Sequence, residues 1–325
     1  RSQLRERWRW TVASTLVLAI FLAPTLWFIM HQPEAAMARF RRISIAQPGM
    51  TPPEVVAQFL INYARHFSPI YLAFTGDPEL RHSLHLPHLL IGEMYPVELP
   101  FLLVGLYFLA KRGGQATAIA IGWMLIAPVA SSMTQVGIPH ALRSLAGIPA
   151  FAMVTGVGFV ESARQLRSST RFWAIATVAL TELACAACFL TGYFATYPKI
   201  SGHAWQNGVG EALAYCRKEA GPESEVWLTE AVGGMVLPAE IITPAEVFVA
   251  FYEQIPPEQF QQNRLNSTRF HVLPLGTSPS ILLTGGKGTP KFLIALVGES
   301  PPGLPVAVFG GSKSQPHATV GVYRL

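Results

Sequence analysis

Five apolar stretches separated by polar segments constrain the fold of this chain more than any other feature of its sequence. A helix needs about 20 predominantly apolar residues to cross the hydrocarbon core of a bilayer. Because 50% of the 325 residues are hydrophobic and only 13% are charged, an ordinary soluble domain is not expected. We therefore expect a multi-spanning α-helical membrane protein with about five spans. They are residues 10–30, 97–110, 116–133, 142–160 and 172–193.

The distribution of Lys and Arg orients these spans. Three short segments next to them, 1–9, 111–115 and 161–171, carry Lys or Arg. Such segments stay in the cytoplasm, whereas the loop 134–141 carries neither residue, so it and the long loop 31–96 are expected to face outward. The long loop also holds several Arg, but long loops obey this charge rule weakly. We thus divide the chain into a transmembrane region, 1–198, which contains the outer loop 31–96, and an extracytoplasmic soluble domain, 199–325.

The net charge of +5 does not indicate a nucleic-acid partner. Four basic residues, Arg1, Arg5, Arg7 and Arg9, directly precede the first span, where they act as a topology signal. The expected surroundings are membrane lipid. Because the chain starts at Arg1 and enters a hydrophobic run at once, we interpret it as the C-terminal portion of a longer protein.

The outer loop is expected to be irregular over 31–53 and helical over 54–65. Within 54–65 the apolar side chains, among them Val55, Phe59 and Tyr63, fall near one helical face. Such an amphipathic helix either lies at the membrane surface or packs on the protein.

Residues 199–325 combine short apolar runs with helical patterns, which predicts a small α/β domain outside the membrane. The runs that predict strands are 226–229, 270–275, 281–284, 292–297, 306–309 and 320–323. Helices are expected at about 205–219 and 244–254, and a further short helix near Pro257, since proline is favourable at a first helical position.

Four basic side chains are candidates for binding a phosphate or sugar-phosphate: Arg81, His82, His140 and Arg143. Arg143 begins a span, where arginine is costly unless it finds a partner, and its planar guanidinium suits phosphate. His140 lies three residues earlier, on the same face of a helix. The alternatives are structural anchoring for Arg143 and a solvated loop face for Arg81 and His82.

Two carboxylates are possible supporting residues. Asp77 lies in a T-G-D-P turn, where it either caps a backbone N–H or contacts an acceptor or a metal. Glu98 begins the second span, where we expect it to pair with Arg81 or Arg143.

Histidines at a spacing of three, His82, His85 and His88, resemble a metal-binding pattern. Pro87 interrupts a continuous helix there, and few carboxylates lie nearby to complete a ligand set. No metal site is therefore expected in this chain.

Three strings of the sequence are similar to one family. They are HFSPIYLAFTGDPELRHS at 66–83, YPVELPFLLVGLYFLAKR at 95–112 and PHALRSLAGIPAFAMV at 139–154. Together they resemble the later part of bacterial GT-C glycosyltransferases, the multi-spanning enzymes of the protein-mannosyltransferase and aminoarabinose-transferase kind (family 39). FVAFYEQIPPEQFQ at 248–261 resembles a recurring string in the outer domain of these enzymes. The resemblance covers about residues 55–265.

The resemblance implies an enzyme that moves a sugar from a polyprenyl-phosphate donor to a lipid, protein or glycan acceptor, at the outer face of a bacterial inner membrane. In the family a carboxylate of the first outer loop is the base and basic groups hold the departing phosphate. The catalytic residue is thus expected upstream of Arg1. The four basic residues would line the cavity near the phosphate, supported by Asp77 and Glu98. The cofactor stays open, a divalent metal held by upstream residues being one option.

The alternative is a non-catalytic membrane anchor that carries an extracytoplasmic module for binding or assembly. An Asp-Glu pair in a short outer loop upstream would favour the enzyme. A transporter is disfavoured, because broken helices and repeated halves, which are common in transporters, are not visible.

Overall fold

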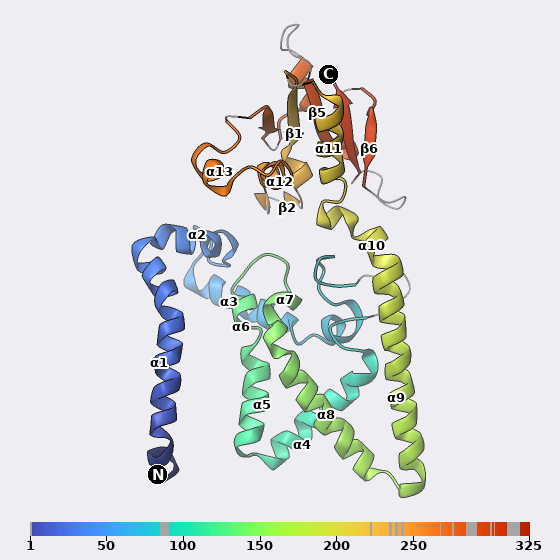
Figure 1. Ribbon diagram of the computed structural model, residues 1–325. Coiled ribbons are helices and arrows are strands. Elements are labelled where there is room, and N and C mark those ends of the chain that lie inside the picture. The colour runs from blue at the N-terminus through green and yellow to red at the C-terminus, as the bar shows by residue number, and fades with distance from the viewer. Residues whose placement is uncertain are drawn as a thin grey trace. The chain divides into compact units, whose positions relative to one another are not determined.

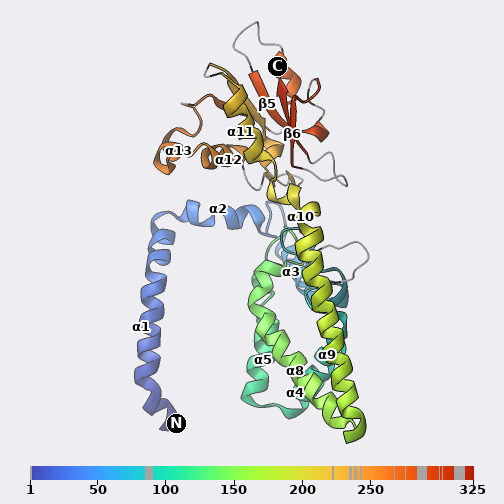
Figure 2. The same ribbon diagram turned by 45° about the vertical axis from the view of Figure 1, so that its right-hand side comes forward.

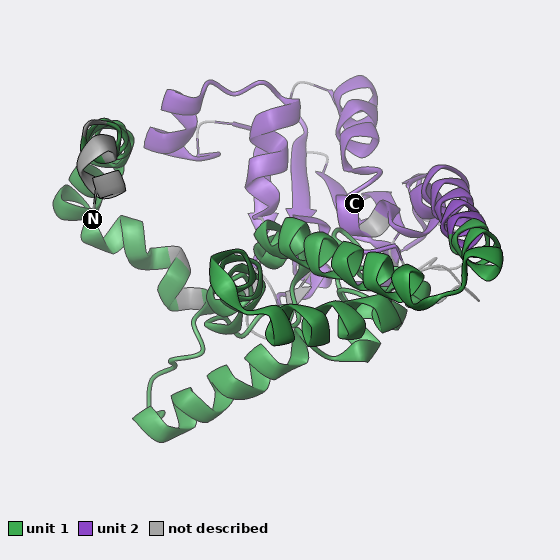
Figure 3. Ribbon diagram, turned by 90° about the horizontal axis from the view of Figure 1, so that it is seen from below, with its two compact units in different colours: residues 1–82, 90–178 green, residues 83–89, 179–325 purple. Residues whose placement is uncertain are grey.

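The structure is a computed structural model of the chain, shown in Figure 1. The residues that it describes are 2–84, 91–221, 223–233, 236–237, 240–241, 244–266, 268–274, 276–283, 291–299, 301, 303–310 and 319–325. His85 and His88 of the predicted metal pattern lie outside them. The chain forms two compact units, residues 1–82 with 90–178 and residues 83–89 with 179–325, which Figure 3 colours green and purple.

The first unit is helical. Its main helices are α1 (Ser2–His31), α2 (Pro33–Ile43), α3 (Pro52–Arg65), α4 (Leu99–Arg112), α5 (Gly114–Ile126), α6 (Val129–Ser132), α7 (Ala141–Ser144) and α8 (Ile148–Gln165). Between α3 and α4 lie a π-helical turn, η1 (Ile70–Thr75), and a 3-10 turn, η2 (Pro96–Glu98). The six candidate residues fall in this connection, in the loop before α7, and in α7 itself.

Four helical segments are long and apolar enough to cross a membrane. They are Trp10–His31, Gly114–Ser132, Ala141–Gln165 and Ser168–Ile200. They coincide with four of the predicted spans, while the predicted span at 97–110 corresponds to α4, which has 14 residues. The backbone turns at Gly113, with φ of 63°, directly after α4. The count of five spans therefore remains a prediction.

Helices α4 and α8 pack in close contact through two glycines, and they cross in both views (Figures 1 and 2). A Cβ atom on Gly105 would lie 1.9 Å from the carbonyl oxygen of Val154, and one on Gly158 would lie 1.8 Å from that of Phe101. Small residues let apolar helices approach in this way without a hydrophobic driving force. At one end of the pair, Glu161 bonds both Arg112 and Arg164.

The segment after α1, residues 32–53, is more helical than predicted. The expectation of irregular structure over 31–53 is wrong for α2, because Pro33 stands at the start of the helix, where its missing N–H does no harm, and Glu34 is favourable in the first turn. The helix predicted at 54–65 is confirmed as α3, which begins with a capping box between Thr51 and Glu54.

The second unit contains a five-stranded sheet of order β4-β1-β5-β7-β6. Strand β1 pairs in parallel with β4 and β5, and β7 pairs antiparallel with β5 and β6. The strands are β1 (Glu225–Thr229), β4 (Phe270–Leu273), β5 (Lys291–Leu296), β6 (Ala307–Phe309) and β7 (Val320–Arg324); β2 (Val236–Leu237) and β3 (Glu240–Ile241) form a separate pair. Five of the six predicted strands are confirmed.

Helices α11 (Val209–Glu219) and α12 (Ala245–Tyr252) pack against the sheet, and α13 (Pro257–Asn263) follows them. All three agree with the predicted helical patterns. Leu213 of α11 and Val249 of α12 are fully buried in one core with residues of β1, β5 and β7. The strand predicted at 281–284 is wrong: its described part, 281–283, belongs to a 3-10 turn, Pro279–Leu283. The turn begins at Pro279, and its residue Leu282 packs in a second, smaller core.

A long helix, α9 (Ser168–Thr191), carries the boundary between the two units, which falls between Val178 and Ala179. It continues through a π-helical turn into α10 (Tyr197–Ile200). The predicted domain boundary at 198/199 and the extracytoplasmic side of the C-terminal domain remain predictions.

Candidate functional site

Asp77 lies at the centre of a polar cluster in the first unit. It follows η1 and Gly76, whose φ of 65° reverses the chain. Its carboxylate is fully buried and accepts hydrogen bonds from the backbone N–H groups of Glu79, at 2.8 Å, and of Ala141, at 2.7 Å. The first of these bonds is the turn cap expected from the sequence. The second joins the segment after η1 to the start of α7.

Two of the predicted basic residues meet at this carboxylate. The Nδ1 atoms of His82 and His140 lie 3.2 and 3.6 Å from Oδ2 of Asp77. The two rings stack with their centroids 4.4 Å apart. The side chain of His82 is 19% exposed and that of His140 is 8% exposed. The fold therefore brings together three predicted site residues from two segments about 60 positions apart in the chain.

His66, which sequence reasoning did not select, supports the cluster from α3. Its Nδ1 lies 2.8 Å from the carbonyl oxygen of Asn62 and must donate to it. Its Nε2 then accepts bonds from the hydroxyl of Ser131 and from the backbone N–H of His140. Burial lowers the pKa of His66, so the ring is neutral, as this network requires. The spacing of four between Asn62 and His66 was the available signal in the sequence.

His140 is also neutral. Its Nδ1 accepts a bond from the backbone N–H of Arg143, as the cap of α7. Burial first, and then the nearby Arg143, His82 and His66, lower the pKa of His140 to about 3. A neutral imidazole accepts a hydrogen bond, or binds a cation, through the one ring nitrogen that carries no proton. It has no positive charge at physiological pH.

Both predicted arginines have partners within the protein. Nη1 of Arg143 donates to the hydroxyl of Thr134, at 2.6 Å, and to the carbonyl oxygen of Val136, at 3.0 Å. Nε of Arg81 donates to the carboxylate of Glu79, at 3.1 Å. These contacts agree with structural anchoring, the alternative left open for Arg143. The phosphate-binding role of both residues stays a prediction.

The loop before α7 is bound firmly by α3. The side-chain amide of Asn62, which is 1% exposed, donates to the carbonyl oxygens of Ser132 and Thr134. The segment after α2 adds two backbone bonds to the same loop, from Ile45 N–H to Met133 and from Gln135 N–H to Ile43. The position of His140 is therefore fixed from several sides.

A cavity of about 140 Å³ adjoins this cluster and is lined only by residues of the first unit. Its walls come from the end of α5, from α7 and α8, from η1 itself and from the segments on either side of η1. Most lining atoms are apolar, but two carboxylates, Glu93 and Glu98, also line it. The remaining lining residues are His66, Phe67, Tyr71, Leu72, Met94, Ala127, Pro128, Ala141, Ser144, Leu145, Ile148, Phe151, Ala152 and Thr155.

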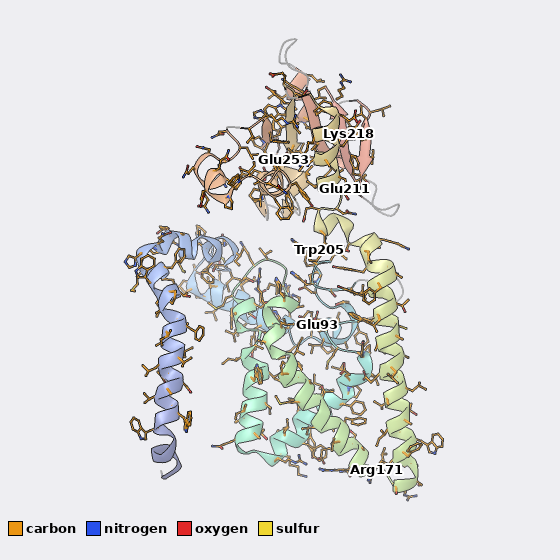
Figure 4. The ribbon with its side chains drawn as sticks, viewed as in Figure 1. Glu93, Arg171, Trp205, Glu211, Lys218 and Glu253 are labelled. Carbon is orange, nitrogen blue, oxygen red and sulfur yellow. The ribbon has the colours of Figure 1, made fainter. Side chains whose placement is uncertain are left out.

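Glu93 is the second residue that sequence reasoning missed. It lies in the segment between η1 and α4 (Figure 4) and accepts the backbone N–H of Asp77 at 3.0 Å. Burial raises the pKa of Glu93 to about 7, against the effect of this hydrogen bond. Glu98 instead caps its own turn by accepting the N–H of Tyr95. No sequence pattern distinguished Glu93, because its properties come from burial.

Two residues that line the cavity, Ser144 and Thr155, carry unsatisfied hydroxyl groups. The Oγ atom of Ser144 and the Oγ1 atom of Thr155 are buried and have no hydrogen-bond partner among the described residues. Buried polar groups are nearly always paired with protein, water or a bound molecule. The cavity itself combines apolar walls with the carboxylates of Glu93 and Glu98, which can accept hydrogen bonds from a hydroxylated ligand.

Comparisons with protein-family models, with curated proteins and with solved structures find no match for this chain.

Proposed function

We propose that this chain is the C-terminal portion of an integral membrane glycosyltransferase, which takes a sugar from a polyprenyl-phosphate donor. One observation carries the proposal: an apolar cavity between membrane-length helices is lined by two carboxylates, Glu93 and Glu98, that can bind a polar ligand. Ligand sites are typically apolar pockets with a few polar groups that fix orientation. The family resemblance of the three sequence strings supports the same conclusion.

The size of the cavity suits one unit of the lipid carrier. At about 140 Å³ it resembles a cavity of ~150 Å³ that accepts benzene. It therefore accommodates one isoprene unit or one ring, with the rest of the carrier in the bilayer. Carboxylates such as Glu93 and Glu98 accept hydrogen bonds from sugar hydroxyls.

In this account the donor phosphate binds near the cluster of Asp77, His82 and His140. Arg81 and Arg143, which are close to these histidines in the sequence, turn toward it. Arg143 would then exchange its contact with Thr134 for the phosphate, which forms a stronger, charge-assisted bond. The base that activates the acceptor is proposed to lie upstream of Arg1. The acceptor, whether lipid, protein or glycan, would approach from the outer face of a bacterial inner membrane.

The alternative is a non-catalytic anchor with an extracytoplasmic binding module. It is favoured by the contacts of Arg81 and Arg143, which engage both guanidinium groups within the protein. In that case the cluster only stabilises the loops, and the cavity binds no lipid phosphate.

To distinguish the two functions, we would measure the affinity of this chain, in lipid nanodiscs, for polyprenyl phosphate. Polyprenol, which lacks the charged phosphate, serves as the comparison. Ala152→Trp fills the cavity, and Met153→Trp, on the same helix but outside the lining, is its matched control. We expect tight binding of the phosphate form, lost in Ala152→Trp and kept in Met153→Trp. Equal binding of both lipids, or of both variants, would rule out the glycosyltransferase proposal.

A second pair of variants tests the phosphate role. Arg143→Ala removes the charge with its bonds to Thr134 and Val136, whereas Thr134→Val removes the bond to Arg143 and the hydroxyl's bond to Ser131 but keeps the charge. Weaker binding in Arg143→Ala alone is expected. If the two variants bind polyprenyl phosphate equally well, Arg143 is a structural anchor.

A further inference from the structure

Asp77, His82 and His140 have the geometry of a metal site. In the part of the chain that the structure describes, this is the one group of three in which a carboxylate oxygen and two imidazole nitrogens lie within 4.8 Å of one another. A tetrahedral ion with ligands at about 2.0–2.2 Å separates its ligand atoms by about 3.3–3.6 Å. The observed separations of 3.2 and 3.6 Å from Asp77 Oδ2 match that spacing.

The ligand atoms are also in suitable states. Nδ1 of His140 carries a lone pair, because it accepts the N–H of Arg143, and at 3.4 Å that bond is long enough for a closer cation to replace it. Nδ1 of His140 and Oδ2 of Asp77 are thus two acceptor atoms that face each other. A positive ion between them removes this unfavourable contact.

Outer-shell contacts hold the ligands in place, as in known metal sites. The carboxylate of Asp77 accepts two backbone N–H groups, and the backbone of His140 is bonded to His66. Neither contact uses the Nδ1 atoms of the two candidate histidine ligands. The low exposure of Asp77 and His140 excludes bulk water, while His82, at 19% exposed, leaves one side open.

We propose that Asp77, His82 and His140 bind one divalent ion of the zinc class. Two imidazoles and one carboxylate suit zinc and its transition-metal neighbours, whereas Mg²⁺ prefers oxygen ligands. Three protein ligands leave a fourth position for water. The ion joins the segment after η1 to the loop before α7. This inference does not depend on the glycosyltransferase proposal, because an anchor would need the same connection between its loops.

The test is metal binding by the whole chain in detergent micelles after treatment with a chelator. Dialysis against Zn²⁺, Mn²⁺ or Mg²⁺, followed by elemental analysis, gives the stoichiometry for each ion. Co²⁺ serves as a spectroscopic probe, since a tetrahedral site with nitrogen ligands gives visible absorption bands. We expect one Zn²⁺ per chain, displaceable by Co²⁺, and no retained Mg²⁺. Absence of zinc from the unmodified protein would overturn the proposal.

His82→Ala is the most informative variant, because this ligand is the least buried of the three and its loss disturbs the fold least. We expect the affinity for Zn²⁺ to fall by more than about 100-fold, the upper limit for loss of an outer-shell partner. His31→Ala, which changes an exposed histidine outside the cluster, is the matched control and should bind as the unmodified chain does. Zinc retained equally by both variants would show binding elsewhere, and would refute the assignment.

A thermal unfolding measurement on the unmodified protein tests the proposal even if the variants fail to fold. Saturating Zn²⁺ should raise the midpoint of thermal unfolding, because a ligand that binds only the folded state stabilises it. The increase should be absent in His82→Ala. An unchanged midpoint in the unmodified protein would mean that the cluster is held by hydrogen bonds alone.

Discussion

The contact between α4 and α8 makes a sharp prediction for Gly158. A methyl group at this position would lie 1.8 Å from the backbone carbonyl oxygen of Phe101, and a backbone atom cannot move aside as a flexible side chain can. Forcing the helices apart should cost about 1–3 kcal/mol, as overpacking of a well-packed core does. Alanine regains roughly 0.5–1 kcal/mol over glycine within a helix. Gly158→Ala should therefore lower the free energy of unfolding by up to about 2.5 kcal/mol.

Gly156→Ala is the matched control, because it makes the same change on the same helix where no atom lies within 4 Å of the added Cβ. It should be neutral, or stabilising by up to ~1 kcal/mol. The assay is reversible unfolding of the chain in detergent micelles, followed by circular dichroism. If Gly158→Ala is as stable as Gly156→Ala, the close approach of α4 and α8 is not a feature of the folded protein.

Three further predictions concern other parts of the chain. Asn62→Ala leaves the carbonyl oxygens of Ser132 and Thr134 without this donor and should cost about 1–3 kcal/mol of unfolding free energy, with Leu60→Ala, an exposed position on the same helix, as the control. Burial raises the pKa of Glu230, so the folded state favours the neutral carboxyl group. The free energy of unfolding should therefore fall as pH rises through and above the usual carboxyl range. Glu230→Gln should remove this part of the pH dependence in unfolding measurements. Burial raises the pKa of Cys216 to about 12, so its thiol should resist maleimide at pH 8 until the chain is denatured, as mass spectrometry of labelled peptides would show; labelling of Cys216 in the folded chain would contradict its place in the core.

Much of the fold was predictable because local patterns determine it. The apolar runs predicted the membrane-length helices, and alternating runs such as 292–297 predicted strands. The failures have local causes as well. The helix α2 begins with Pro33, which looks like a loop residue in sequence, and 281–283 form a 3-10 turn despite a strand-like composition.

The site was only partly predictable, because it depends on distant residues. Asp77, His82 and His140 were each selected from their sequence context, but the sequence does not show that a single carboxylate oxygen lies near both histidines. Nor does the sequence show which groups form hydrogen bonds with Arg81 and Arg143. Glu93 and His66 were missed because burial and hydrogen bonding, rather than their neighbours in the chain, give them their properties.

The central claim, that the cavity binds a lipid-linked sugar, is tested most directly by photo-crosslinking. The chain in nanodiscs is incubated with a polyprenyl-phosphate sugar that carries a diazirine in the isoprene unit next to the phosphate. After irradiation, the crosslinked residues are mapped by mass spectrometry. The account predicts crosslinks to cavity residues of α7 and α8, such as Ser144 and Phe151, that excess polyprenyl phosphate removes and polyprenol does not. Crosslinks spread over lipid-exposed residues such as Leu180, unaffected by either competitor, would contradict it.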